Sequence, residues 1–171
     1  MNAHPSDLPN MLAPDGQNAR QLRDAFGRFA TGITVVTCAS DLGPVGMTAN
    51  SFSSISLDPA LVLWSPSKTS RRYPAFAAAD HYAIHVLSEG QRDVCQTFAQ
   101  DGFALARMHH DVSEAGVPLI AGCLARFECR RTALHDAGDH VLVVGEVQRA
   151  EWRLGEPLAF FGGKYGKFAQ A

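Results

Sequence analysis

Two long runs of alternating apolar and polar residues, 122–134 and 139–153, constrain the fold of this chain more than any other feature of its sequence. The segment that joins them, "HDAGD", is typical of a turn, so the two runs predict a long antiparallel hairpin. Shorter runs rich in β-branched or apolar residues predict four further strands, at residues 33–39, 45–57, 60–65 and 81–87.

Three predicted helices stand between these strands. Residues 18–30 are amphipathic, residues 70–79 form a short helix with Pro74 in its first turn, and residues 90–101 form the third helix. The apolar side chains lie on one face of the first helix (Leu22, Ala25, Phe26 and Phe29) and on the inward face of the third (Val94, Cys95 and Phe98).

Because the helices are inserted between strands and do not alternate with them, the pattern argues against a doubly wound parallel sheet. It predicts a mainly β fold, an antiparallel β-barrel with inserted helices, as a single domain over residues 18–171. Residues 60–65 are apolar throughout and are expected to be buried on both faces. Residues 1–17 are predicted to be a flexible arm.

Composition narrows the functional classes. A net charge of -2 gives no general attraction to nucleic acid or to anionic lipid, so any anion site must be local. The 4 cysteines form no CxxC pair, which favours buried thiols in a reducing compartment. No signal-peptide pattern and no long apolar run is present, so we expect a cytoplasmic protein that does not span a membrane.

The stretch "GPVGMTANSFSSISLDPALVLWSPSKTSRRY" gathers hydroxyl groups, glycines and cations. Thr48 and Asn50 share one face of a strand, and Gly46 lets a flat ligand approach the backbone. The next strand is followed by Ser65, Ser67, Lys68, Ser70, Arg71 and Arg72. If residues 67–71 begin a helix, its free N–H groups complete a phosphate pocket. A serine-rich turn before a solvated basic helix is the alternative interpretation.

The segment "HDAGDHVLVVGEV" places Asp139 and His140 at the start of a strand. His140 can donate to a bound ring or carboxamide, and Asp139 can orient that histidine or cap the turn. In the aromatic and glycine-rich tail, Tyr165 can pack in the core or stack on a planar ligand. The histidine and aspartate clusters at 109–111 and 135–140 have no HExxH or zinc-finger spacing, so no metal is expected.

The chain has no P-loop, GxGxxG or GxSxG motif. However, "FGRFATGITVVT", "VGMTANSFSSISLDPALVLWSPSKTS", "YAIHVLS", "GDHVLVVGEV" and "PLAFFGGKYGKF" occur in the order seen in the short-chain flavin reductases, and the chain resembles that family over nearly its whole length. These enzymes supply reduced flavin to two-component monooxygenases in aromatic catabolism. The resemblance implies an FMN-binding split barrel, a homodimer, FMN or FAD as cofactor, and NADH or NADPH as co-substrate.

The resemblance also implies roles for individual residues. The expected cofactor-binding residues are Val45, Gly46, Met47, Thr48, Asn50, Ser51, Ser65, Pro66, Ser67, Arg71, Arg72 and Phe98, with Lys68 a further candidate at the phosphate. His140 and Tyr165 match the side from which nicotinamide approaches, and no side chain is expected to act as an acid or base. The partner is expected to be a separate oxygenase that receives diffusing reduced flavin.

Three alternatives to a flavin reductase stay open at this level. A pyridoxamine-phosphate-oxidase-like enzyme uses the same barrel with oxygen. A flavin-binding electron carrier or sensor would bind FMN without turnover, and a metal-binding or purely structural barrel would bind no flavin. The sequence also leaves open which flavin and which nicotinamide nucleotide are used.

Overall fold

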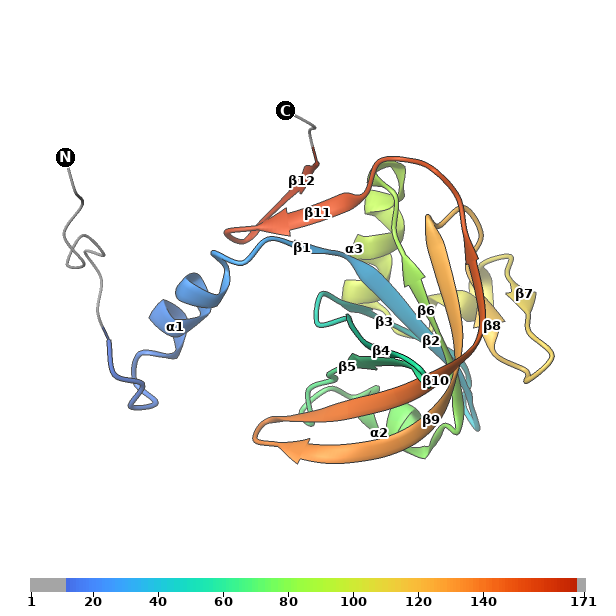
Figure 1. The fold of residues 1–171 in the computed structure, drawn as a ribbon, viewed down its shortest axis with the longest axis horizontal. Helices are drawn as coiled ribbons and strands as arrows, with labels where there is room; N and C mark the ends of the chain where they lie inside the picture. The colour runs from blue at the N-terminus through green and yellow to red at the C-terminus, as the bar shows by residue number, and fades with distance from the viewer. Residues whose placement is uncertain (1–11, 169–171) are drawn as a thin grey trace.

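The computed structural model describes residues 12–168 and is built around one large antiparallel sheet (Figure 1). Its seven strands are β2 (Thr34–Ser40), β3 (Gly43–Ala49), β4 (Ser53–Leu57), β5 (Ala60–Trp64), β6 (His81–Val86), β9 (Ala125–Ala137) and β10 (His140–Trp152). Their order in the sheet is β3-β2-β6-β9-β10-β5-β4. The mainly β, antiparallel, single-domain prediction is confirmed. Residues 1–11 of the predicted arm lie outside the described residues.

Two smaller sheets and five helical segments complete the described part of the chain. A three-stranded sheet contains β1 (Thr31–Gly32), β11 (Leu158–Phe161) and β12 (Lys164–Lys167), and a two-stranded sheet contains β7 (Asp111–Val112) and β8 (Pro118–Leu119). The helices are α1 (Ala19–Phe26), α2 (Tyr73–Ala78) and α3 (Arg92–Gln100), with 3₁₀ turns η1 (Glu89–Gln91) and η2 (Ala104–Arg107). None of these helices is long and apolar enough to cross a membrane.

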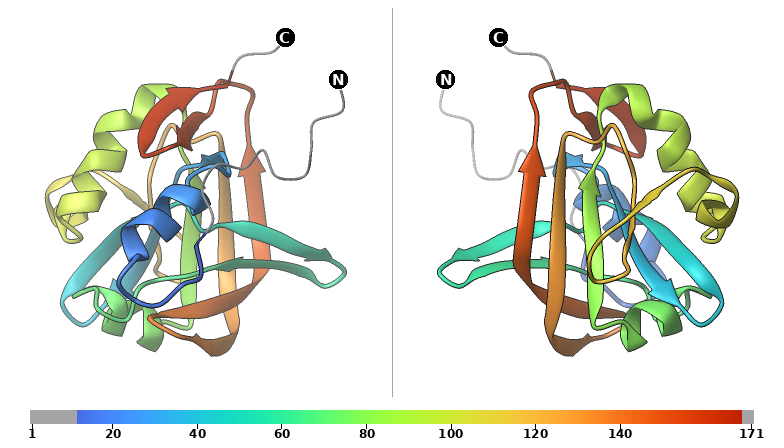
Figure 2. Two further views of the ribbon diagram at one scale, coloured as in Figure 1. Left: turned by 90° about the vertical axis from the view of Figure 1, so that its left-hand side faces the viewer. Right: turned by 90° about the vertical axis from the view of Figure 1, so that its right-hand side faces the viewer.

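The large sheet curls around an inner core and is covered outside by α3 (Figures 1 and 2). Buried side chains from β2, β3, β5, β6, β9, β10 and α2 form the inner cluster, which includes Trp64, Phe76 and Tyr82. An outer cluster joins the other face of β2 to α3 and includes Val35 and Phe98. The strands buried on both faces are β2 and β6, in which Thr34–Cys38 and Tyr82–His85 are all buried. The prediction of this role for 60–65 is wrong, because Val62 and Trp64 of β5 are buried whereas the alternate residues Leu61 and Leu63 are only partly buried.

The predicted single strand over 45–57 is two strands that lie at opposite edges of the sheet. β3 pairs with β2, whereas β4 pairs with β5, and residues 50–52 cross between the two edges. The composition of this stretch shows no break, because serine and threonine fit strands and turns equally well. The crossing brings the two edges of the sheet together and closes the barrel at the serine-rich segment.

The predicted long hairpin is confirmed as β9 and β10, with a turn of only two residues, Gly138 and Asp139. Its register shifts twice, between Val144 and Gly145 and between Val147 and Arg149, which lets the long strands bend. A Cβ at Gly145 would lie 2.1 Å from the Tyr82 hydroxyl oxygen, so the inner core depends on glycine at this position.

The first predicted helix is shorter than expected. α1 ends at Phe26, and the two residues that follow the predicted helix, Thr31 and Gly32, form a strand that pairs with β11. The Gly162 N–H donates to the Gly27 carbonyl at 2.9 Å, which ties the end of α1 to the β11–β12 turn. No residue of α1 is buried, and Phe26 is 69% exposed. Phe26 and Phe29 of the apolar face predicted for this helix are therefore exposed in the isolated chain. Figure 1 shows α1 standing away from the large sheet.

Candidate functional site

The crossing segment and the end of β5 bring the predicted serines together. The Ser65 backbone N–H donates to Ser51 Oγ at 2.9 Å, and Ser51 Oγ also lies 3.4 Å from the Ser65 carbonyl oxygen. Both serines are half-buried, and the neighbouring Asn50 is exposed. The structure therefore places three of the predicted ring- and ribityl-binding residues side by side at the closure of the barrel.

The same surface continues to His140. The Val141 N–H donates to the Pro66 carbonyl at 3.1 Å, and Ser67 and His140 form an antiparallel β-bridge. Because bridge partners point to the same face of a sheet, the Ser67 and His140 side chains are neighbours, and Ser65 shares the face of Ser67. The segment that follows β5 and the start of β10 thus meet at one surface.

Lys68 fastens the β9–β10 turn to this surface. Its backbone N–H donates to the Asp139 carbonyl at 2.9 Å, and Nζ donates to Asp136 Oδ2 at 2.5 Å and to the Gly138 carbonyl at 2.6 Å. The hydrogen bond from Lys68 holds the pKa of the Asp136 carboxyl below its usual value. We leave Lys68 out of the phosphate site because its ammonium group is already paired.

The two adjacent arginines have different environments. The Arg72 guanidinium donates to the carbonyls of Phe98 and Ala99, the latter at 3.0 Å, so it caps the C-terminus of α3. A Cβ at Gly102 would lie 2.4 Å from Arg72 Cδ, so Arg72 is packed as well as bonded. Arg71 is exposed, and no residue in the range 12–168 makes a hydrogen bond or ion pair with its guanidinium. Of these two arginines, Arg71 is thus the one available to an anion.

The predicted phosphate pocket is conditional on a helix that begins at 67–71, and that condition is not met, because α2 begins at Tyr73. This segment is a series of turns in which the N–H groups of Ser70 and Tyr73 donate to the carbonyls of Ser67 and Ser70 at 3.1 and 3.0 Å. The Thr69 N–H lies 3.3 Å from Ser67 Oγ. A phosphate bound here would not meet the N-terminus of a helix, and the exposed Arg71 guanidinium is the cation beside it.

The β3 part of the predicted site is a packed support. Val45 and Met47 belong to the inner core cluster, and Phe98 has no exposed surface. A Cβ at Gly46 would lie 2.6 Å from the Phe98 ring, and the Gly46 N–H donates to the Gly102 carbonyl at 2.8 Å. The open space that glycine leaves over β3 is filled by Phe98, so the prediction that Gly46 leaves room for a ligand is wrong.

Thr48 and Tyr165 both attach to α3. Thr48 Oγ1 donates to the Cys95 carbonyl at 2.7 Å. The Cys95 side chain raises the pKa of Tyr165. The Arg92 guanidinium lies 5.4 Å from the centre of the Tyr165 ring. In residues 12–168 no hydrogen bond or ring contact joins Tyr165 to His140. The two residues predicted to bind the nicotinamide, His140 and Tyr165, are therefore not in direct contact with each other.

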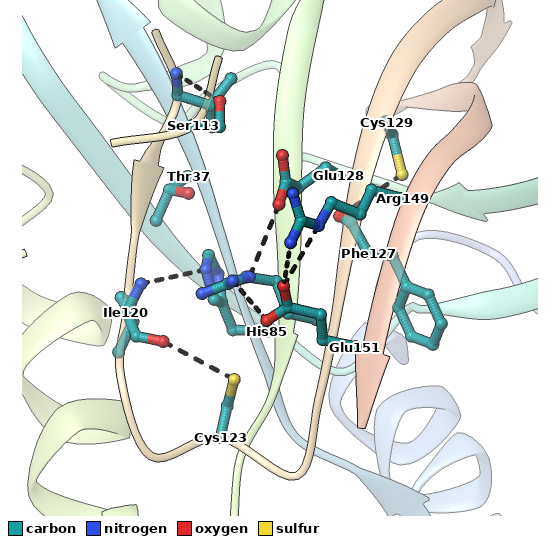
Figure 3. Close-up of polar contacts among 12 residues, drawn as sticks. Thr37, His85, Ser113, Ile120, Cys123, Phe127, Glu128, Cys129, Arg149 and Glu151 are labelled. Carbon is teal, nitrogen blue, oxygen red and sulfur yellow. Dashed lines mark hydrogen bonds and ion pairs between the residues drawn. The ribbon is translucent and has the colours of Figure 1, made fainter. Parts of the chain in front are cut away.

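Two cavities lie elsewhere on the outer face of the barrel, and sequence analysis missed both. One, of about 350 Å³, is lined by residues that include His81, Glu128 and Arg149. The other, of about 210 Å³, lies beside Cys123 and Trp152. Figure 3 shows the polar contacts between them. No predicted site residue lines either cavity, and no local motif marks their residues, which come from separate strands and loops.

His85 lies at the centre of that view and is fully buried. Its Nδ1 lies 3.0 Å from the Val35 carbonyl. Its Nε2 accepts a hydrogen bond from the Ile120 N–H at 3.1 Å, as Figure 3 shows. This pattern requires the neutral ring with its proton on Nδ1. Burial lowers the pKa of His85 to about 4. His85 therefore joins the segment after β8 to the sheet. Within residues 12–168 no group of three or more metal-ligating side chains gathers.

Comparison with known proteins identifies the family. The model of the flavin reductase like domain matches residues 26–169. The chain belongs to this family. It is 53% identical over 165 residues to the FMN reductase (NADH) SmoA of Agrobacterium fabrum, covering 95% of each chain. It is 47% identical over 150 residues to the reductase component of the flavin-dependent trigonelline monooxygenase of Acinetobacter baylyi, but spans only 48% of that longer relative.

A solved structure supports the same assignment. The Streptomyces globisporus NADH:FAD oxidoreductase SgcE6, determined in complex with NAD and FAD fragments, matches with a TM-score of 0.85 and 38% identity. The match covers 93% of this chain and 98% of that one. The split-barrel architecture expected from the sequence is consistent with this likeness.

Proposed function

We propose that this flavin reductase family member transfers a hydride from NADH or NADPH to FMN or FAD and supplies reduced flavin to a separate oxygenase. The observation that carries the proposal is the continuous surface from Ser51 through Ser65 and Ser67 to His140. It joins the predicted flavin side to the predicted nicotinamide side. The names of the related proteins, which are NADH-dependent flavin reductases and monooxygenase reductase components, support the same activity.

The side chains on this surface fit a flavin nucleotide. Asn50, Ser51 and Ser65 offer an amide and two hydroxyl groups for ring and ribityl oxygens, and Arg71 offers an unpaired cation for the phosphate. When bound, flavin and nicotinamide supply the redox chemistry, hydride passing from nicotinamide C4 to flavin N5. The protein supplies the orientation of the two nucleotides.

The test is oxidation of NADH and of NADPH, each with FMN, FAD and riboflavin, followed by the loss of nicotinamide absorbance. We expect catalytic oxidation of at least one nicotinamide nucleotide without an added amine. Oxidation that requires a pyridoxamine-type amine would favour the oxidase alternative. Flavin binding without turnover would favour a carrier or sensor, and a protein that binds no flavin would contradict the proposal altogether.

We propose in addition that the protein is a homodimer. Large apolar side chains are exposed on α1, where Phe26 and Phe29 are 69% and 78% exposed, and on the edge strand β4, where Ile55 and Leu57 are 46% and 95% exposed. Exposed apolar groups of this size typically mark an interface. Light scattering after gel filtration should give twice the chain mass of 18.4 kDa at micromolar concentration. A monomer under those conditions would contradict the dimer.

The delivery of reduced flavin by diffusion is also a proposal. It rests on the open position of the candidate site, where Asn50 and Arg71 are exposed. After anaerobic reduction with excess NADH, ultrafiltration through a membrane that retains the protein should pass reduced flavin into the filtrate. Flavin that stays with the protein would indicate transfer within a complex instead.

A further inference from the structure

The position of His140 is fixed by its neighbours before any nucleotide binds. The β-bridge to Ser67 sets its backbone, and the three hydrogen bonds from Lys68 hold the turn that precedes it. What remains to be set is the orientation of the imidazole ring and the location of its proton. Both depend on the group that contacts the ring.

That group is Asp139. Its Oδ1 lies 2.8 Å from His140 Nδ1, and this contact lowers the pKa of the Asp139 carboxyl, which is therefore ionised at neutral pH. An ionised carboxylate can only accept a hydrogen bond. The proton of a neutral His140 ring therefore resides on Nδ1, and Nε2 carries a lone pair.

Nε2 of His140 is available to a ligand. The side chain is 42% exposed, and no residue within 12–168 makes a hydrogen bond to Nε2. Asp139 contacts the ring, and the other charged groups of this turn, Asp136 and Lys68, are paired with each other. The nicotinamide carboxamide carries one NH₂ donor and one carbonyl acceptor. An Nε2 lone pair is complementary to the NH₂ group and not to the carbonyl.

We propose that Asp139 is a positioning residue that presets His140 Nε2 as an acceptor for the carboxamide NH₂ of the nicotinamide. The inference rests on the proposed function and adds a specificity rule to it: the site selects an amide at this position over a group of similar shape without N–H. Asp139 acts only through His140.

The first measurement determines the tautomer without any substrate. Nitrogen-15 NMR of histidine-labelled protein, with His140 assigned by the His140→Ala variant, should show a protonated Nδ1 and an unprotonated Nε2 at neutral to mildly alkaline pH. In Asp139→Ala the proton should move substantially to Nε2, because the carboxylate that held it on Nδ1 is absent. Asp136→Ala removes a carboxylate from the same turn and should leave the His140 tautomer unchanged.

The second measurement compares kcat/KM for NADH with kcat/KM for reduced 3-acetylpyridine adenine dinucleotide, in which a methyl group replaces the NH₂. Loss of one hydrogen bond predicts that Asp139→Ala lowers the preference for NADH about threefold to tenfold relative to wild type. Asp136→Ala should keep the wild-type preference. In the His140→Ala background, Asp139→Ala should have no further effect on the preference.

The outcomes separate this inference from the proposed function. If Asp139→Ala only loosened the turn, it would lower the kcat/KM for NADH and for the analogue by the same factor. The preference would then be unchanged, which would overturn the inference but not the proposed reductase activity. An unchanged tautomer would overturn it equally. A wild-type protein that oxidises no NADH or NADPH would overturn the proposed function and this inference with it.

Discussion

The two ends of the candidate site differ in how their residues are held. At the α3 end, Phe98 and Gly46 are packed against each other inside the protein. At the β9–β10 end, Lys68, Asp139 and His140 lie at the surface and are held by hydrogen bonds and one ion pair. Both ends match the same family pattern, yet the first is a support and the second can meet a ligand.

Arg71 and Arg72 show the same difference at adjacent positions. Arg72 is committed to the carbonyls at the end of α3, whereas Arg71 is exposed. Residue type therefore does not decide which cation binds an anion. Pairing within the fold decides it, because a guanidinium that already donates to two carbonyls would leave them unsatisfied if it moved to a phosphate.

The largest expected effect tests whether the α3 end is a support. Phe98→Ala should lower the free energy of unfolding by about 3–5 kcal/mol, because it leaves a cavity in the outer cluster. Phe168→Ala, the same deletion at a 60% exposed position, should change it by less than about 0.5 kcal/mol. Urea unfolding measures both. Phe98→Leu should keep FMN affinity, and a large loss of affinity in that variant would show that Phe98 contacts flavin directly.

The second effect is the pH dependence of the free energy of unfolding, and it arises from the buried His85. The unfolded chain binds a proton near the ordinary histidine pKa of 6.5, whereas the folded protein keeps the ring neutral until about pH 4. The contribution is therefore fully present above about pH 6.5 and is lost as the pH falls toward 4, by about 3 kcal/mol.

Urea unfolding of wild type and His85→Gln across this pH range checks the His85 contribution, with the exposed His81→Gln as control. The decline in stability should be smaller in His85→Gln alone. NMR titration of the wild-type ring gives an independent test. A His85 that titrates near 6.5 in the folded protein would contradict the assignment.

The third effect separates the two arginines. Arg72→Ala should lower the free energy of unfolding by about 2 kcal/mol, because two carbonyls of α3 lose a charged donor. Arg71→Ala should leave stability unchanged within about 0.5 kcal/mol and weaken FMN binding about fivefold, a smaller effect because the site is exposed. Thermal unfolding and flavin titration measure the two quantities. The reverse result would place the phosphate at Arg72.

The smallest effect tests the β9–β10 end. His140→Ala should raise the KM for NADH about fivefold and leave the FMN affinity within about twofold. The melting temperature should stay unchanged, because the side chain is 42% exposed. Steady-state kinetics, flavin titration and calorimetry provide the three numbers. Equal losses of NADH use and flavin binding would contradict the assignment of His140 to the nicotinamide.

Much of the fold could be predicted from the sequence because strand and turn signals are local. The β9–β10 hairpin, the β2–β3 hairpin and the inward face of α3 all follow from periodicity and turn residues. The split of 45–57 into two strands could not, because it depends on which partner each half pairs with. The exposed face of α1 could not either, since periodicity identifies an apolar face without showing what covers it.

By itself, the sequence determined the residue types, their order, and hence an antiparallel barrel with a serine- and arginine-rich segment and a histidine after a turn. Only the tertiary structure decided how these residues are used. Arg71 is exposed, whereas Arg72 is hydrogen-bonded to α3, and the Phe98 ring fills the space beside Gly46. Lys68 is bonded to the β9–β10 turn, and His140 lies beside Ser67. The physical reason is that burial and hydrogen-bond pairing are set by segments far apart in the chain, and these determine whether a polar group is free to meet a ligand.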